Sequence, residues 1–194
     1  MKEYRKIKKI VLDRLERDTP DYLTYHNLHH TLDVLAVCDS YIKRNKLREE
    51  DAITLRFGAL LHDLGYTLTV KEHEEKSAQL AEELMSQEKI APQVINEVTG
   101  LILATKVPQS PNTDLEKIIC DADLDYLGRK DYPEISNRLF LELKALGIIE
   151  TPEEWHAKQI SFIQNHSYHT EFARKYREPI KRKWLEKLEN NHPF

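Results

Sequence analysis

A histidine–aspartate pair stands at the end of a strongly apolar stretch of the chain. Residues 52 to 61 contain only Thr54 and Arg56 as polar side chains, and His62 and Asp63 follow them. The pattern predicts a buried helix, so the pair would lie in or beside an apolar core. A carboxylate is costly there, and Asp63 would also face the negative end of the helix dipole. A divalent cation near this helix end would offset both costs.

A purely structural pair is the alternative. His62 would then hydrogen-bond a backbone carbonyl, while Asp63 would pair with an arginine or cap a neighbouring helix. The choice depends on whether further polar side chains point into the same core.

The helix expected over residues 28 to 44 supplies one such side chain. At about 100° per residue, His30 falls on its apolar stripe, whereas His29 falls on a polar side and is expected to be solvated or to support the site from outside. His26 precedes this helix beside Asn27, a residue type that favours the N-cap position. Taken alone, His30 could also be a hydrogen-bonded core residue.

The segment DLEKIICDADLDYLG supplies a further carboxylate. Ile118 and Ala122 belong to its apolar face, and Asp123 lies nearest that face among the acids of DADLD. Asp121 falls nearly opposite and Asp125 farther round, so we expect both to face solvent. Asp123 is the carboxylate expected to point inward.

Two imidazoles and two carboxylates thus point inward from three helices: His30, His62, Asp63 and Asp123. This mixed nitrogen and oxygen set suits an octahedral ion with open positions better than a closed structural zinc site. An ion of this kind can turn a water into a nucleophile at neutral pH and polarise a phosphoryl oxygen.

The four residues form an H…HD…D signature, and with it the chain resembles the HD-domain superfamily of metal-dependent phosphohydrolases. The resemblance extends over about residues 20 to 190. It rests on the segments 25–30, 61–63, 74–78, 101–105, 121–128 and 168–172.

The resemblance implies an all-helical HD fold and one divalent metal ion held by the four residues, with Mn, Fe, Mg, Co and Ni as candidates. It implies hydrolysis of a phosphate ester or anhydride of a small phosphorylated metabolite, with a nucleotide favoured, by a water that the metal activates. A single ion is favoured because only His73 offers an additional imidazole, and Lys106 stands where a binuclear site would need another.

Further residues receive roles in the reaction. The stretch around His26 is also similar to cyclic-nucleotide phosphodiesterases, which implies that His26 protonates the leaving oxygen; hydrogen bonding near a helix start is its alternative. Asp63 is expected to act in catalysis as well as in metal binding. His73 would bind substrate or transfer the proton instead. Lys106 and Arg129 would supply positive charge to a substrate phosphate, although Lys106 could equally be a surface lysine.

Two other functions compete with hydrolysis. The same pocket could hold metal and nucleotide without turnover, as a sensor or regulatory module, or the chain could be a purely structural helical protein. Intact ligands favour the enzyme but do not identify its substrate.

The elements that must position these side chains are helices. Five glycines, eight prolines and the lack of sustained alternation predict an all-α fold of about eight or nine helices without significant β-sheet. One domain is expected over residues 1–194, with its core at about 20–130 and C-terminal helices at about 131–190 packed on it. The expected helices are 2–17, 28–44, 49–64, 73–88, 92–106, 114–128, 131–146, 152–166 and 171–190.

Composition excludes several classes of partner. The 194 residues carry a net charge of −4 without a broad basic surface, so a nucleic-acid duplex is not expected as a partner. No apolar run is long enough for a membrane span. Two cysteines cannot form a disulfide framework, so a cytoplasmic protein is expected. A homo-oligomer is possible.

Overall fold

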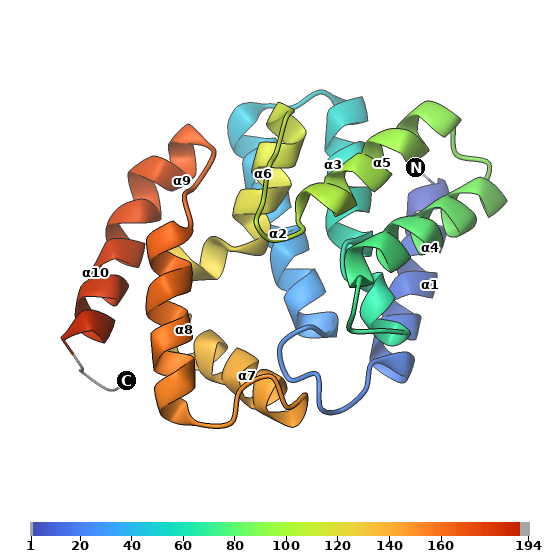
Figure 1. Cartoon of the computed structure of the whole chain (residues 1–194). Coiled ribbons are helices and arrows are strands. Elements are labelled where there is room, and N and C mark those ends of the chain that lie inside the picture. Colours follow the sequence, from blue (N-terminus) through green and yellow to red (C-terminus); the bar gives the residue numbers. More distant parts are fainter. Residues whose placement is uncertain (1, 191–194) are drawn as a thin grey trace. The chain divides into compact units, whose positions relative to one another are not determined.

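The structure is a computed structural model of the chain, and it describes residues 2–190 (Figure 1). These residues form ten α-helices, nine of them at least seven residues long, two short 3-10 helices and no strand. The expectation of an all-α fold is therefore confirmed. The elements are α1 (Lys2–Asp18), α2 (Leu28–Asn45), α3 (Glu49–Leu61), η1 (Leu64–Thr67), α4 (His73–Gln87), α5 (Pro92–Ala104), α6 (Asp114–Asp123), η2 (Asp125–Gly128), α7 (Tyr132–Ala145), α8 (Pro152–Asn165), α9 (Glu171–Tyr176) and α10 (Glu178–Glu189).

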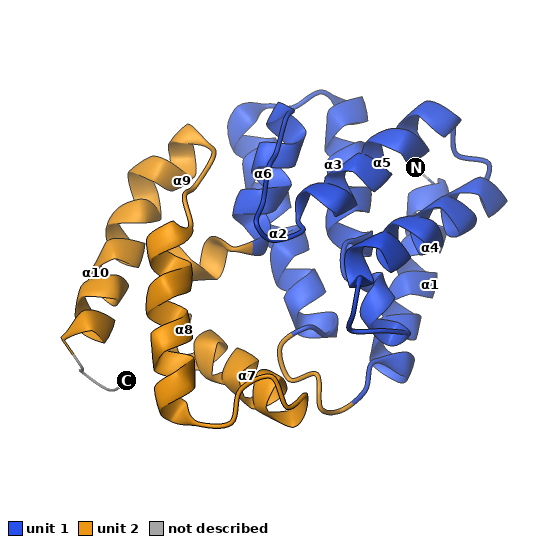
Figure 2. Ribbon diagram, in the orientation of Figure 1, with its two compact units in different colours: residues 1–20, 26–123 blue, residues 21–25, 124–194 orange. Residues whose placement is uncertain are grey.

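The chain divides into two compact units (Figure 2). The first comprises Met1–Pro20 and His26–Asp123, and its described part contains α1 to α6 with η1. The second comprises Asp21–Tyr25 and Leu124–Phe194, and its described part contains η2 and α7 to α10. A single domain over the whole chain stays a prediction.

Helix α3 is the centre of the first unit. It packs against α1, α2, α5 and α6, and its side chains Phe57, Leu60 and Leu61 are fully buried. Each large apolar side chain removed from water contributes roughly 1.5–3 kcal/mol. The expectation of a buried helix before His62 is thus confirmed.

The start of helix α2 is fixed by a side-chain cap. The Asn27 carboxamide oxygen accepts a hydrogen bond from the backbone N–H of His29 at 2.9 Å. This satisfies one of the N–H groups that a helix start leaves unpaired. The expected N-cap is confirmed, and it sets the orientation of the first turn, which carries His30.

Three of the expected helices differ from the structure by more than two residues. The third and sixth expected helices change to the 3-10 elements η1 and η2 at their ends. The last expected helix, 171–190, is divided into α9 and α10 at Arg177. Pro179 explains this break, since proline has no N–H to donate and its ring displaces the preceding turn.

In the second unit, the segment 21–25 is held by helix α7. The backbone N–H of Tyr25 donates to the buried Glu142 carboxylate at 2.8 Å, and the Thr24 hydroxyl donates to the carbonyl of Arg138 at 2.6 Å. The chain therefore enters the His26 region from an anchored segment.

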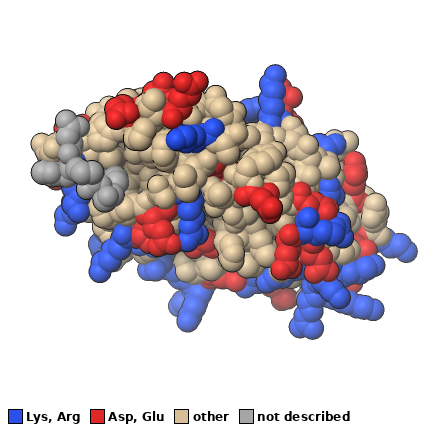
Figure 3. Space-filling view, turned by 90° about the horizontal axis from the view of Figure 1, so that it is seen from below, with Lys and Arg blue, Asp and Glu red and all other residues tan. Residues whose placement is uncertain are grey.

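Charges of both signs are mixed on the surface. Figure 3 shows Lys and Arg side chains among Asp and Glu side chains over the face that it draws. Within the described residues, no helix combines the length and apolar character that a membrane span needs.

Candidate metal centre

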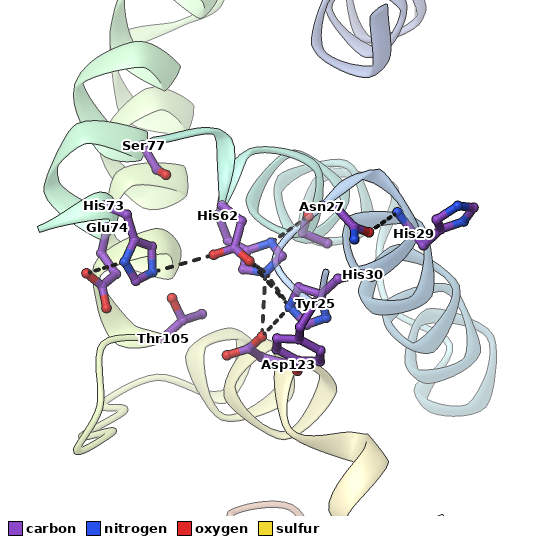
Figure 4. Close-up of polar contacts among 12 residues, drawn as sticks. Tyr25, Asn27, His29, His30, His62, His73, Glu74, Ser77, Thr105 and Asp123 are labelled. Carbon is purple, nitrogen blue, oxygen red and sulfur yellow. Dashed lines mark hydrogen bonds and ion pairs between the residues drawn. The ribbon is translucent and has the colours of Figure 1, made fainter. Parts of the chain in front are cut away.

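The four expected ligand residues come together where α3 and α6 end. His30 lies in the first turn of α2, His62 and Asp63 directly follow α3, and Asp123 is the last residue of α6. The Nε2 atoms of His30 and His62 are 3.3 Å apart. Asp123 Oδ1 lies 3.0 Å from the first nitrogen and 3.5 Å from the second. Figure 4 shows the side chains of His30, His62 and Asp123 pointing toward one another, while His29 points away.

The ligand atoms of His30, His62 and Asp123 lie within 4.8 Å of one another and could hold a metal ion, and Asp63 adds a carboxylate oxygen beside the two imidazoles. Its Oδ2 lies 3.4 Å from His30 Nε2 and 3.2 Å from His62 Nε2. Adjacent ligands at about 2.0–2.2 Å from one ion are about 2.8–3.6 Å apart. The separations between the imidazole nitrogens and the carboxylate oxygens all fall in this range, so each carboxylate oxygen is spaced from the two imidazoles as a ligand of one divalent cation would be.

A buried carboxylate oxygen supports the same interpretation. Asp63 Oδ2 is buried and has no hydrogen-bond partner, and the Asp63 side chain forms ion pairs with histidines rather than with an arginine. Leaving such an atom unsatisfied is costly, and a bound cation would remove that cost. The contacts of Asp63 therefore do not favour the structural alternative, in which this carboxylate pairs with an arginine.

The orientation of His62 leaves one nitrogen available to an ion. Its Nδ1 lies 2.9 Å from the backbone carbonyl of Ala59, which fixes the ring and assigns the proton to Nδ1. Nε2 points into the cluster, where it can bind a cation once its proton is released. This is the backbone contact expected of a structural histidine, but it is also the usual support of a metal-binding one.

The charges of the cluster stabilise one another. Burial lowers the pKa of His62, but the neighbouring carboxylates of Asp63 and Asp123 outweigh burial and hold that pKa well above its ordinary value. Burial raises the pKa of Asp123, yet hydrogen bonds with His30 and His62 bring it down to about 2. The pKa of Asp63 is likewise lowered, because the His62 charge outweighs burial. The carboxylates are therefore ionised and ready to bind a cation.

The two candidate proton-transfer histidines lie beside this cluster. His73 Nε2 is 3.6 Å from Asp63 Oδ1, the oxygen that does not face His30, and His73 Nδ1 is 3.4 Å from Glu74 Oε2. The His26 ring meets the His30 ring edge to face at 5.8 Å between centroids. Both histidines are thus within the first unit and near the expected ligands.

The two expected phosphate-binding cations already have acidic partners. Lys106 is exposed and forms an ion pair with Glu75. Arg129 belongs to the second unit, where its guanidinium donates to Asp131 at 3.0 and 2.9 Å. Their role toward a substrate stays a prediction.

Two acids that we expect at the surface are buried. Asp121 is 0% exposed and Asp125 is 1% exposed, so the expectation is wrong for both. Helix α6 packs against α2, α3 and α5, which covers more than its apolar face. Asp125 follows α6 in the second unit, where Arg177 Nε donates to it at 2.6 Å. No local sequence signal points to a partner so distant along the chain.

Mn²⁺ is expected to raise the melting temperature of the wild-type chain. Binding at 100 times the dissociation constant adds about 2.7 kcal/mol, which corresponds to roughly 5–11 °C for a chain of this length. Differential scanning calorimetry of His30→Ala should show little of this shift. His29→Ala is the matched control, since His29 is exposed, and it should keep the full shift. Equal shifts in both variants would rule out His30 as a ligand.

The comparisons with known proteins find one family. A family model described as HD domain matches residues 27–125, about half of the chain, and this range contains all four residues of the cluster. No curated protein and no solved structure shows a significant match.

Proposed function

The chain belongs to the HD-domain family, and from this premise we propose that it is a metal-dependent phosphohydrolase acting on a phosphate ester or anhydride of a small metabolite. The observation that supports the proposal is the cluster of His30, His62 and Asp123, whose ligand atoms lie within 4.8 Å of one another and could hold a metal ion. Asp63 Oδ2 lies 3.4 and 3.2 Å from the two imidazole nitrogens of this cluster. HD domains as a group bind divalent metals and hydrolyse phosphate bonds, and this donor set suits that chemistry.

We propose that the four residues hold one divalent ion. Such an ion polarises a phosphoryl oxygen and lowers the pKa of a water. The chain supplies the positioning: the Ala59 carbonyl fixes the His62 ring, and the buried Asp63 carboxylate presents Oδ2 to both imidazoles. Burial excludes bulk water and strengthens each of these electrostatic interactions.

The leaving oxygen needs a proton, and we propose His26 as its donor. A histidine suits this step because its ordinary pKa is close to neutrality. His73 is the second candidate, and its Nε2 lies 3.6 Å from Asp63 Oδ1. His73 is otherwise a candidate for binding the substrate phosphate.

We propose a nucleotide as the substrate. The phosphates of a nucleotide would need positive charge at the site. Lys106 and Arg129 are the candidate cations, and each would have to exchange an acidic partner for the substrate. The proposed location is the cytoplasm, with which the buried free thiols of Cys38 and Cys120 agree.

A substrate screen tests this function. Metal-stripped protein is incubated with phosphomonoesters, phosphodiesters and nucleotides, each with Mn²⁺, Fe²⁺, Co²⁺, Ni²⁺ or Mg²⁺, and phosphate or alcohol release is measured. We expect release from at least one substrate class, only when metal is present. Nucleotide binding without release under every metal would instead indicate a sensor or regulatory module.

A further inference from the structure

We propose that Tyr66 is a positioning residue that fixes the rings of His26 and His73 beside the metal-binding cluster. The inference rests on the proposed function, because it assigns Tyr66 a part in the reaction that these histidines serve. Nothing in the sequence pattern singles out Tyr66, which stands three residues after Asp63.

The Tyr66 ring stacks on both histidines. Its centroid lies 4.3 Å from that of His26, with an interplanar angle of 17°, and 4.0 Å from that of His73, with an angle of 27°. The two imidazoles are themselves 6.1 Å apart. One aromatic ring therefore links two side chains that are far apart in the sequence, at distances typical of favourable ring pairs.

Tyr66 is itself held in place by its backbone. It lies in η1, where its N–H donates to the carbonyl of Asp63 at 3.1 Å. The preceding N–H, that of Gly65, donates to the Ser77 hydroxyl at 2.7 Å. Tyr66 is buried, and the same short segment carries the expected ligand Asp63. The ring is thus tied to the cluster through four consecutive residues.

The two histidines need such a support. His26 stands in the turn before α2, and His73 is the first residue of α4, so neither has a helical turn on both sides. The polar contacts of the His73 ring are all long: Nδ1 lies 3.3 Å from the Val70 carbonyl and 3.4 Å from Glu74 Oε2, and Nε2 lies 3.6 Å from Asp63 Oδ1. Contacts of this length fix the ring only loosely. Stacking on a buried ring restricts the tilt of both imidazoles. Proton transfer requires this restriction, because the reacting nitrogen has to face the substrate.

Two substitutions separate the ring from its hydroxyl. Tyr66→Phe keeps the stacking surface, whereas Tyr66→Leu removes it. Tyr41→Leu is the matched control, because Tyr41 is a buried tyrosine of α2 that lies about 16 Å along the helix from His30. The protein is studied as the full chain, and kcat, KM, Mn²⁺ affinity and melting temperature are measured for each variant.

Tyr66→Leu is expected to lower kcat by about 10²-fold, with KM and Mn²⁺ affinity close to wild type. Tyr66→Phe should keep the kcat of the wild type. Tyr41→Leu should lower the melting temperature without lowering kcat. An unchanged kcat in Tyr66→Leu would overturn the inference. An equal loss in Tyr66→Phe would also overturn it, because the hydroxyl would then be the acting group.

A second readout does not depend on turnover. In Mg²⁺-loaded protein, NMR of labelled histidines should show ring-current shifts for His26 and His73 in wild type and Tyr66→Phe, and their loss in Tyr66→Leu. If the wild type hydrolyses nothing, the proposed function fails while these shifts still test the positioning. Identical histidine spectra in wild type and Tyr66→Leu would show that Tyr66 does not hold the rings.

Discussion

Asp63→Asn is expected to lower the rate of hydrolysis by on the order of 10³-fold or more, since a metal supplies several kcal/mol of transition-state stabilisation. The amide has nearly the same shape as the carboxylate but no charge. It removes the negative charge from the buried group that faces both His30 and His62, and with it most of the attraction for a cation. The measurement is kcat/KM on the best substrate of the screen, at saturating metal.

Asp39→Asn is the matched control for this variant. Asp39 lies on α2 in the same unit, where its exposed carboxylate accepts a hydrogen bond from Arg56 at 2.7 Å. A surface change of this kind usually alters stability by no more than about 0.5 kcal/mol and should leave the rate unchanged. A rate near wild type in Asp63→Asn would contradict the assignment of Asp63.

Gly65→Ala is expected to destabilise the first unit by about 3 kcal/mol, an effect at the upper end of overpacking. A Cβ at this position would lie 2.2 Å from the backbone carbonyl oxygen of His73 and 2.9 Å from the Ser77 hydroxyl. The nearer atom is backbone, so the start of α4 would have to move. That movement would also shift His73 relative to Asp63 and lower activity.

Urea unfolding measures this effect, with Gly100→Ala as the control. A Cβ at Gly100 would meet only Glu116 Oε1, at 3.9 Å, and alanine favours the helix over glycine by about 1 kcal/mol. Gly100→Ala should therefore match or exceed the stability of the wild type. Equal stability of Gly65→Ala and the wild type would show that η1 does not pack tightly against α4.

The helices could be predicted because glycine, proline and apolar periodicity are local signals. The ends of α3 and α6 could not be predicted, because the chain changes to 3-10 geometry soon after each of them. This change follows His62 and Asp63 after α3, and it follows Asp123 after α6. Apolar periodicity does not distinguish a last α-helical turn from a 3-10 turn. The break at Arg177 had a local signal in Pro179, which periodicity alone overlooks.

The sequence also predicts that the side chains of the cluster point inward, again because the signal is local. His30 and Asp123 each fall on or near an apolar stripe, and such a stripe faces the core whatever the rest of the fold is. Contacts between residues far apart in the sequence could not be predicted. Arg177 pairs with Asp125 across 52 positions, and Tyr66 stacks on two histidines that are far apart in the sequence. Such contacts depend on how the elements pack, not on local spacing.

The central claim is that one divalent ion is bound by the four converging side chains. Titration of the metal-stripped chain with Mn²⁺, followed by the EPR signal of the free ion, tests it without any substrate. The account predicts that the wild type takes up one Mn²⁺ per chain and that Asp123→Asn takes up none over the same concentrations. Uptake by Asp123→Asn equal to that of the wild type, or no uptake by the wild type, would contradict it.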